Sequence, residues 1–77
     1  MRPKKADIRH RFGVAIKHRR EELGFTQEEF AERAEIHRTY LSDIERGTRN
    51  LSLQNIERLA MPLSTTLPNL FARVATA

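Results

Sequence analysis

The segment Glu35–Arg49, EIHRTYLSDIERGTR, carries the side chains with the most specific chemistry in this 77-residue chain. Its apolar spacing predicts a short helix that turns Leu41 and Ile44 inward, so that the polar side chains around them project outward and Tyr40 lies at the border. These outward groups donate and accept hydrogen bonds, as the edges of DNA bases do in the major groove. The expected base-contacting residues are Arg38, Thr39, Tyr40, Ser42 and Asp43.

The first turn of this helix offers three different contacts. Arg38 can donate two hydrogen bonds to O6 and N7 of a guanine, which is the commonest base-specific contact. Thr39 offers a hydroxyl to a base or a phosphate and a methyl group to thymine, whereas Tyr40 could bond a phosphate while its ring packs on a sugar or a thymine methyl. A single exposed arginine or tyrosine is usually ordinary surface, but three such groups on one turn favour a functional face.

Asp43 admits two interpretations. Its carboxylate would face DNA phosphates or accept a hydrogen bond from cytosine N4. It could instead hold Arg46 or Arg38 in position, and we favour this orienting role.

A basic, hydroxyl-rich turn follows the helix and suits phosphate contacts, which set register and affinity without reading sequence. The expected phosphate-contacting residues in this turn are Arg46, Thr48, Arg49 and Asn50. Each such cation should add nearly one unit to the salt dependence of binding, so Arg49→Ala should weaken specific and non-specific binding alike.

Five helices and no convincing strand are predicted around this segment, which makes the fold all-α. The first opens near Asp7 and stops at Gly24, and the second opens with the capping box of Thr26 and Glu29. The third ends at Gly47, the fourth runs from a Ser52 cap to a stop at Pro62, and the fifth spans 67–75. The positions expected to face inward are Ile8, Phe12, Ile16, Leu23, Phe30, Ala31, Ala34, Leu41, Ile44, Leu53, Ile56, Leu59, Ala60, Leu67, Leu70, Phe71 and Val74.

Arg20 falls on the same helical stripe as Phe12 and Ile16, where a guanidinium needs a partner. The third helix offers Glu45 beside the inward residue Ile44, so we predict a partly buried Arg20–Glu45 ion pair that ties the first helix to the third. The alternative is that Arg20 extends past Leu23 to water.

Length and composition limit the classes of protein that are possible. A chain of 77 residues forms one small domain, here 1–77 with a flexible basic arm at 1–6, and the absence of cysteine excludes disulfides and thiolate metal sites. No apolar run approaches the roughly 20 residues of a membrane span, and no signal peptide is visible, so we expect a cytoplasmic protein. His10, His18 and His37 lack the spacing of metal ligands, and no catalytic constellation or glycine-rich phosphate loop is visible, so neither an enzyme nor a cofactor is expected.

A resemblance now adds to these observations. The stretch Thr26–Gly47, TQEEFAERAEIHRTYLSDIERG, resembles the helix-turn-helix of the Cro and phage-repressor family through its T-Q-x-x-[LF]-A start and its S-x-I-E-x-G end. Within that family, His37–Asn50 is most similar to the controller proteins of restriction-modification systems, which are homodimeric transcriptional regulators. The resemblance implies a compact lambda-repressor-like domain whose helix-turn-helix is formed by helices 2 and 3.

The family pattern also bears on Gln27, at the start of the second helix, and on Glu35, in the turn that follows this helix. The second helix of such proteins is placed on a phosphate by its N-terminus, which gives Gln27 and nearby backbone amides a phosphate-contacting role here. Glu35 stands where members often have glycine, because the position commonly adopts a left-handed conformation. A non-glycine residue there costs roughly 1 kcal/mol.

The expected function is sequence-specific recognition of double-stranded DNA by a transcriptional regulator, with a restriction-modification controller as one candidate. One recognition helix reads only about four base pairs, so we expect a homodimer on a palindromic operator with its helices about 34 Å apart. The expected dimer interface consists of Leu67, Leu70, Phe71 and Val74 on the fifth helix, with core packing as the alternative. RNA polymerase is a candidate partner through the acidic second helix, and no membrane or small-molecule substrate is expected. The alternative function is an antitoxin that neutralises a toxin and regulates its own gene.

Overall fold

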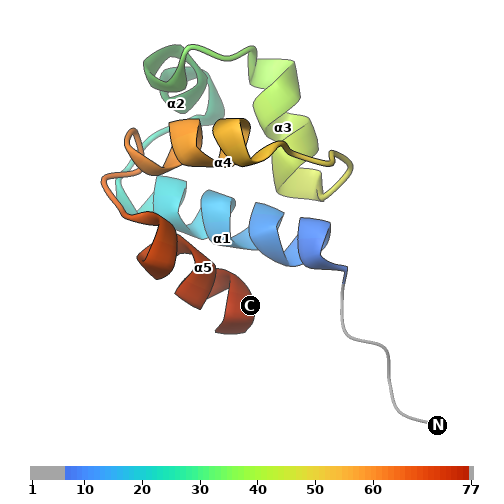
Figure 1. The fold of residues 1–77 in the computed structure, drawn as a ribbon. Coiled ribbons are helices and arrows are strands. Elements are labelled where there is room, and N and C mark those ends of the chain that lie inside the picture. Colours follow the sequence, from blue (N-terminus) through green and yellow to red (C-terminus); the bar gives the residue numbers. More distant parts are fainter. Residues whose placement is uncertain (1–6, 77) are drawn as a thin grey trace, which may run out of the picture.

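Five α-helices account for most of residues 7–76, which are the residues that the structure, a computed structural model, describes (Figure 1). The helices are α1 (Ile8–Glu22), α2 (Gln27–Ala34), α3 (Arg38–Arg46), α4 (Leu53–Ala60) and α5 (Leu67–Thr76). Residues 7–76 contain no β-strand, so the predicted all-α fold with five helices is confirmed. The predicted basic arm at 1–6 lies outside the described residues.

Side-chain caps fix where four of the helices begin, including α5, where Asn69 N donates to Thr66 Oγ1 at 3.3 Å. At the start of α1, the Asp7 carboxylate accepts a hydrogen bond from the Arg9 backbone N–H at 2.7 Å. The predicted capping box of α2 is present, because Glu29 N donates to Thr26 Oγ1 at 3.1 Å and Thr26 N donates to Glu29 Oε1 at 2.9 Å. Ser52 caps α4 as predicted, and each cap satisfies an N–H group that has no partner within its helix.

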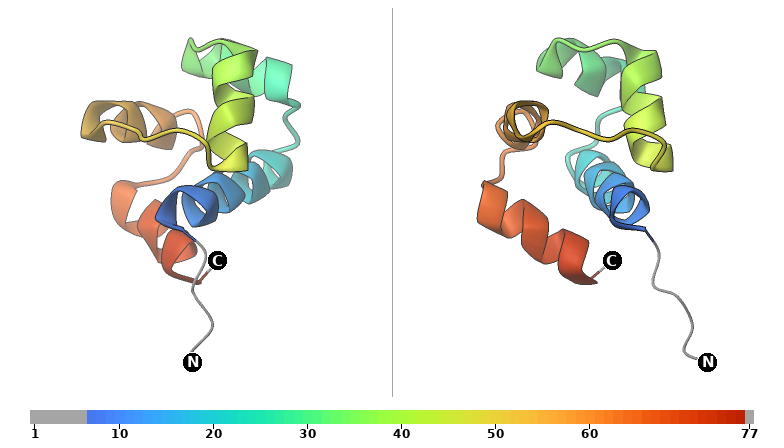
Figure 2. Two further views of the ribbon diagram at one scale, coloured as in Figure 1. Left: turned by 90° about the vertical axis from the view of Figure 1, so that its right-hand side faces the viewer. Right: turned by 45° about the vertical axis from the view of Figure 1, so that its right-hand side comes forward.

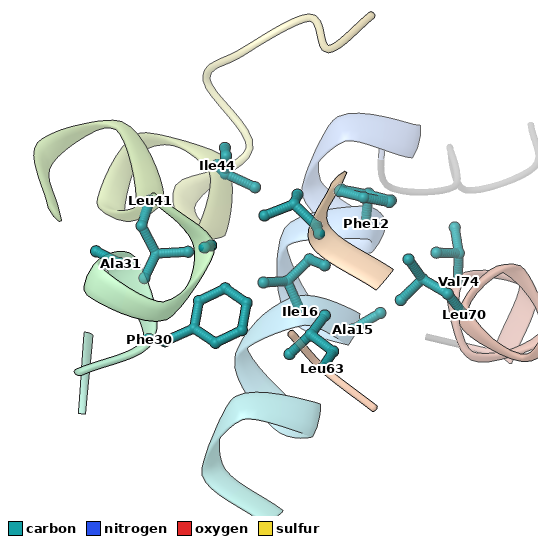
Figure 3. Close-up of a cluster of buried hydrophobic side chains, with 12 residues drawn as sticks. Phe12, Ala15, Ile16, Phe30, Ala31, Leu41, Ile44, Leu63, Leu70 and Val74 are labelled. Atoms are coloured by element: carbon teal, nitrogen blue, oxygen red, sulfur yellow. The ribbon is translucent and has the colours of Figure 1, made fainter. Parts of the chain in front are cut away.

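A single apolar core lies between α1 and the other helices (Figure 3). Its largest fully buried side chains are Phe30, Ile16, Leu41, Leu63 and Leu70. Leu63, which the sequence pattern does not place inward, lies in the turn between α4 and α5, where Figure 3 shows it close to Ile16.

Four of the residues predicted to face inward are exposed. Two of them, Leu67 and Phe71 of α5, are 36% and 37% exposed. Leu53 is 82% exposed and Ile8 is 56% exposed. Each begins its helix, whereas the buried residues of α4 are Leu59 and Ala60 near its other end. The apolar stripe of a helix can therefore continue past the part that neighbouring helices cover, and the expected inward position of all four residues is wrong.

The helices α1 and α3 touch through their backbones. A Cβ atom added at Gly13 would lie 2.3 Å from the Ile44 carbonyl oxygen and 2.6 Å from that of Glu45, which is closer than any real side chain approaches. In both views of Figure 2 the C-terminal end of α3 lies against the N-terminal half of α1. Glycine at position 13 thus sets how closely the two helices can approach.

Ion pairs and hydrogen bonds hold α5 and the preceding turn against α1. Arg73 Nη2 donates to Glu22 Oε1 at 2.7 Å, and Arg19 Nε donates to the Leu63 carbonyl oxygen at 2.9 Å. The hydrogen bonds from Arg73 and then Arg19 lower the pKa of Glu22 to about 2. No helix within residues 7–76 has the length and apolar character needed to cross a bilayer.

Candidate nucleic-acid interface

The turn between α2 and α3 closes through a residue in the left-handed region. Glu35 has φ 58° and ψ 43°, and the N–H of Ile36 donates to the Ala31 carbonyl oxygen at 2.9 Å. This is the hydrogen-bond pattern of a Schellman motif, in which glycine is the usual left-handed residue. Glu35 thus adopts the left-handed conformation that this position commonly takes in the family, and the hydrogen bond and the packing of Ile36 on the core offset its cost of roughly 1 kcal/mol.

A buried ion pair fixes the inner side of α3 to α1. Arg20 Nε donates to Glu45 Oε2 at 2.7 Å and Arg20 Nη2 donates to Glu45 Oε1 at 3.0 Å, while Nη1 donates to the Phe25 carbonyl oxygen at 2.7 Å. The two side chains are only 9% and 5% exposed, and the hydrogen bonds to Glu45 raise the pKa of Arg20 above its ordinary value. The predicted Arg20–Glu45 pair is therefore present in this structure.

Gln27 takes part in the same network. Its Nε2 donates to Glu45 Oε1 at 3.0 Å, so one of its two amide hydrogens is bound inside the protein. The other amide hydrogen and the N-terminal N–H groups of α2 are what Gln27 and its surroundings can offer to a phosphate. The expected phosphate contact of Gln27 stays a prediction. Its hydrogen bond to Glu45 also helps to dock α2 on α3, a role that the sequence pattern does not indicate.

The outward face of α3 carries the predicted base-contacting residues. Leu41 and Ile44 are buried, whereas Arg38 and Thr39 are exposed on the first turn. Ser42 and Asp43 are half-buried one turn further along the helix. The helix therefore has the amphipathic division that its sequence predicts, and its polar side is open at its N-terminal end.

Tyr40 lies at the border of the helix, as predicted, and joins α3 to α4. Its hydroxyl accepts a hydrogen bond from Asn55 Nδ2 at 3.1 Å, and the guanidinium carbon of Arg49 lies 5.1 Å from the centre of its ring. The hydroxyl proton remains able to donate to a phosphate. The sequence pattern does not indicate Asn55, because nothing in the spacing of α4 shows which neighbour its amide meets.

Asp43 lies between two arginines. Its Oδ1 accepts from Arg46 Nη2, and its Oδ2 accepts from Arg49 at 3.2 Å from Nη2 and 3.3 Å from Nε. The contact with Arg46 agrees with the predicted orienting role, but the second partner is Arg49 rather than Arg38. Arg46 also donates from Nη1 to Ser42 Oγ at 3.0 Å, so Ser42 contacts the last residue of its own helix as well as facing outward.

The turn after α3 is folded back on the same residue. The backbone N–H and the hydroxyl of Thr48 both donate to the Asp43 carbonyl oxygen at 3.1 Å. Arg46, Arg49 and Asn50 are exposed around it. The structure thus brings the predicted phosphate-contacting residues of this turn together beside the outward face of α3.

The predicted dimer interface is wrong in two of its four residues. Leu70 and Val74 are 0% and 2% exposed and belong to the core of the protomer, because one side of α5 packs on α1. Leu67 and Phe71 are 36% and 37% exposed and remain available to a partner. Met61, 83% exposed near the end of α4, is a further apolar side chain on the surface that the sequence pattern does not indicate.

Within residues 7–76, no group of three or more histidine, cysteine, aspartate or glutamate side chains could hold an ion.

Comparisons with known proteins agree with this geometry. A family model described as helix-turn-helix matches residues 16–70. A control protein, C.MunI from a Mycoplasma species, is 44% identical over 69 residues, which cover 88% of this chain and 93% of the relative. The control protein C.BamHI of Bacillus amyloliquefaciens is 47% identical over 58 residues, covering 74% of this chain and 72% of the relative.

A solved structure of a related protein extends the comparison to the fold. The restriction-modification controller protein C.Esp1396I, as a tetramer in complex with its natural 35 base-pair operator, superposes with a TM-score of 0.84 at 30% identity, covering 94% of this chain and 95% of that one. The chain therefore belongs to the helix-turn-helix family of DNA-binding transcription regulators, which are binding proteins and not enzymes.

Proposed function

We propose that this protein regulates transcription by binding a palindromic double-stranded operator as a homodimer, in the manner of a restriction-modification controller. The observation that carries the proposal is the outward face of α3, where Arg38 and Thr39 stand exposed on a helix docked by buried contacts. A rigid helix with hydrogen-bonding side chains at its N-terminal end is what the major groove accepts in helix-turn-helix complexes.

Solved structures of the related controller support a DNA-contacting role for the residues on the first turn of α3. Its structure was solved on operator DNA, and further structures carry single substitutions of an arginine, a threonine and a tyrosine that follow one another in its chain. The same three residue types occur in the same order here, at Arg38, Thr39 and Tyr40. We assign Arg38 and Thr39 to base edges, and Tyr40 to the backbone and sugar beside them.

Phosphate contacts fall to the turn that follows α3. Arg46, Arg49 and Asn50 are exposed beside the outward face of α3, so they can bind phosphates of the DNA strand on either side of the groove. Such contacts supply affinity that is independent of sequence and falls as salt rises.

Dimerisation uses the exposed apolar side chains of α4 and α5. Leu53, Met61, Leu67 and Phe71 are large, apolar and between 36% and 83% exposed, and Met61 and Leu67 line one hollow between α4 and α5, so these four side chains are our candidates for a surface that another chain covers. Two copies related by a twofold axis would present two α3 helices to half-sites about one helical turn apart.

If the ligand is an operator, the cellular compartment and the protein partner of this regulator can also be proposed. The relatives reported above are control proteins, which favours a controller over the antitoxin alternative. A bacterial regulator of this kind works in the cytoplasm, where the DNA is. Glu28, Glu29 and Glu32 of α2 remain our candidate contacts for RNA polymerase.

Selection of bound sites from random duplexes tests the DNA-binding proposal. We expect the wild-type protein to select two inverted half-sites. Arg38→Ala should lose about 1–3 kcal/mol of operator binding and should relax the preference at one base pair in each half-site. Arg58→Ala is the matched control, because it removes an exposed arginine of α4 outside this face. A selected pool without any sequence preference would contradict the proposal.

Sedimentation tests the homodimer. Leu53 and Met61 are so exposed that Leu53→Lys and Met61→Lys should leave the protomer fold unchanged while they place charges in the interface. We expect the wild type to sediment at twice the protomer mass of 9.0 kDa and the double variant to sediment as the protomer. A wild-type protein that stays monomeric at micromolar concentration would refute the homodimer.

A further inference from the structure

The carboxylate of Asp43 holds the phosphate-binding turn together from several directions. It accepts hydrogen bonds from Arg46 and Arg49, while the carbonyl oxygen of the same residue accepts from the backbone N–H and the hydroxyl of Thr48. Asp43 therefore contacts three of the four residues that are expected to meet phosphate, namely Arg46 at the end of α3 and Thr48 and Arg49 in the turn. Its side chain is only 18% exposed, so these contacts are partly shielded from water.

Arg49 is held on a second side as well. Its guanidinium lies over the ring of Tyr40, whose hydroxyl accepts from Asn55 at the start of α4. The chain of contacts runs from Arg46 through Asp43, Arg49 and Tyr40 to Asn55, and it spans α3, the turn and α4. We call these five residues the arginine clamp.

A carboxylate in a DNA-binding face should lower the affinity for DNA. It lies close to where phosphates would run, and it offsets the charge of two arginines that would otherwise attract any duplex. Non-specific binding depends on the number of phosphates that cations neutralise, so this carboxylate weakens binding to DNA of any sequence. Specific binding needs the same cations at fixed positions, where the carboxylate helps by restricting their rotamers.

We propose that Asp43 is a positioning and specificity-determining residue, which aims Arg46 and Arg49 at operator phosphates and suppresses binding to other DNA by offsetting their charge. The proposal rests on the DNA-binding function proposed above. Asp43 touches no base in this scheme, so it raises the ratio of operator affinity to non-specific affinity without changing which bases are preferred.

Asp43→Asn tests the proposal because asparagine keeps the shape of the side chain and removes its charge. An amide has one acceptor oxygen, so it can serve only one of the two arginines, and its NH₂ group would face the other. The backbone carbonyl that binds Thr48 is retained. Glu21→Gln is the matched control, since it makes the same change in net charge at an exposed position of α1 outside the clamp.

The measurement is the dissociation constant for the selected operator and for a scrambled duplex, each over a range of salt concentrations. We expect Asp43→Asn to tighten scrambled-duplex binding, to steepen its salt dependence by up to about one unit, and to lower the operator-to-scrambled ratio by roughly tenfold. Site selection with the variant should return the wild-type half-site. Glu21→Gln should leave the ratio within about twofold of wild type, since both affinities change together.

A double-mutant cycle separates positioning from simple repulsion. In an Arg49→Ala background, Asp43→Asn should change the ratio much less than it does in the wild type, because one of the two aimed arginines is already absent. An equal fold-change in both backgrounds would overturn the clamp. So would a rise in operator and scrambled affinity by the same factor, which indicates repulsion alone. Loss of preference at a single base pair would show instead that Asp43 reads a base.

The same data distinguish this inference from the proposed function. A wild-type protein with no operator preference would overturn the proposed function itself. A wild-type preference that Asp43→Asn keeps in full would overturn the clamp and leave the proposed function standing. Thermal melts of each variant show whether binding was measured on folded protein.

Discussion

Glu45→Ala should remove a large share of the stability of this domain. The substitution leaves the Arg20 guanidinium buried with only the Phe25 carbonyl oxygen as acceptor, and it takes away the partner of Gln27 Nε2 as well. Breaking a buried ion pair by removing one partner costs about 3–5 kcal/mol. A domain of this size is typically stable by roughly 4–12 kcal/mol, so the loss is a large share of the total.

Thermal unfolding followed by circular dichroism measures this loss. Each kcal/mol shifts the melting temperature of a domain of this length by about 4–8 °C, so Glu45→Ala should melt at least about 12 °C below the wild type. Glu32→Ala, which removes an exposed carboxylate from α2, should change stability by no more than about 0.5 kcal/mol.

A variant without either charge tests the reason for the loss. Arg20→Met combined with Glu45→Leu removes the unpaired buried charge, so it should recover most of the stability. If Glu45→Ala melts together with the wild type and Glu32→Ala, the pair does not dock α3. If the double variant melts as low as Glu45→Ala, the loss comes from packing and not from a stranded charge.

Three further predictions concern the supports of this face. Gly13→Ala should unfold the domain or lower its melting temperature by more than about 10 °C, because the added methyl meets the carbonyl oxygen of Ile44; a melt near the wild-type value would contradict the close contact. Glu35→Gly should stabilise by up to about 1 kcal/mol in a denaturant titration, since glycine adopts the left-handed conformation without strain, and a lower midpoint would count against this reasoning. The pKa of Glu22 is lowered to about 2 from 4.5, so the stability from its pair with Arg73 is present above pH 4.5 and is lost as the pH falls toward 2. The hydrogen-exchange protection factors of the α5 amides, which correct for the intrinsic pH dependence of exchange, should therefore fall over this range in the wild type more than in Glu22→Gln, and equal responses would show that the pair does not hold α5.

Local signals in the sequence were sufficient for the helices and their ends. The Thr26 and Glu29 pair, the Ser52 cap and the stop at Gly47 each act within one turn of the chain, so the residues themselves specify them. The Arg20–Glu45 pair was also predictable, because a charge on an apolar stripe requires a partner and α3 offers one at the right position.

Features that depend on how helices meet were not predictable from spacing. The stripe of α5 contains both core and surface residues, and only the position of α1 decides that Leu70 and Val74 are covered while Leu67 and Phe71 are not. The contact of Asp43 with Arg49 depends on the path of the turn after α3, which reverses the chain over a few residues. Periodicity shows which side of a helix is apolar, but it does not show how far a neighbour extends along it.

The backbone contact at Gly13 has a consequence for evolution, because the position that sets the approach of α1 and α3 is separate from the outward positions of α3. The close approach of the two helices requires that position 13 has no side chain, and substitutions on the outward face of α3 do not alter this requirement. Arg38 and Thr39 are exposed and contribute nothing to the buried core, so they can be exchanged at little cost to folding. A duplicated gene could therefore acquire a new operator through a few outward substitutions, while drift at position 13 would be eliminated by selection for a folded protein.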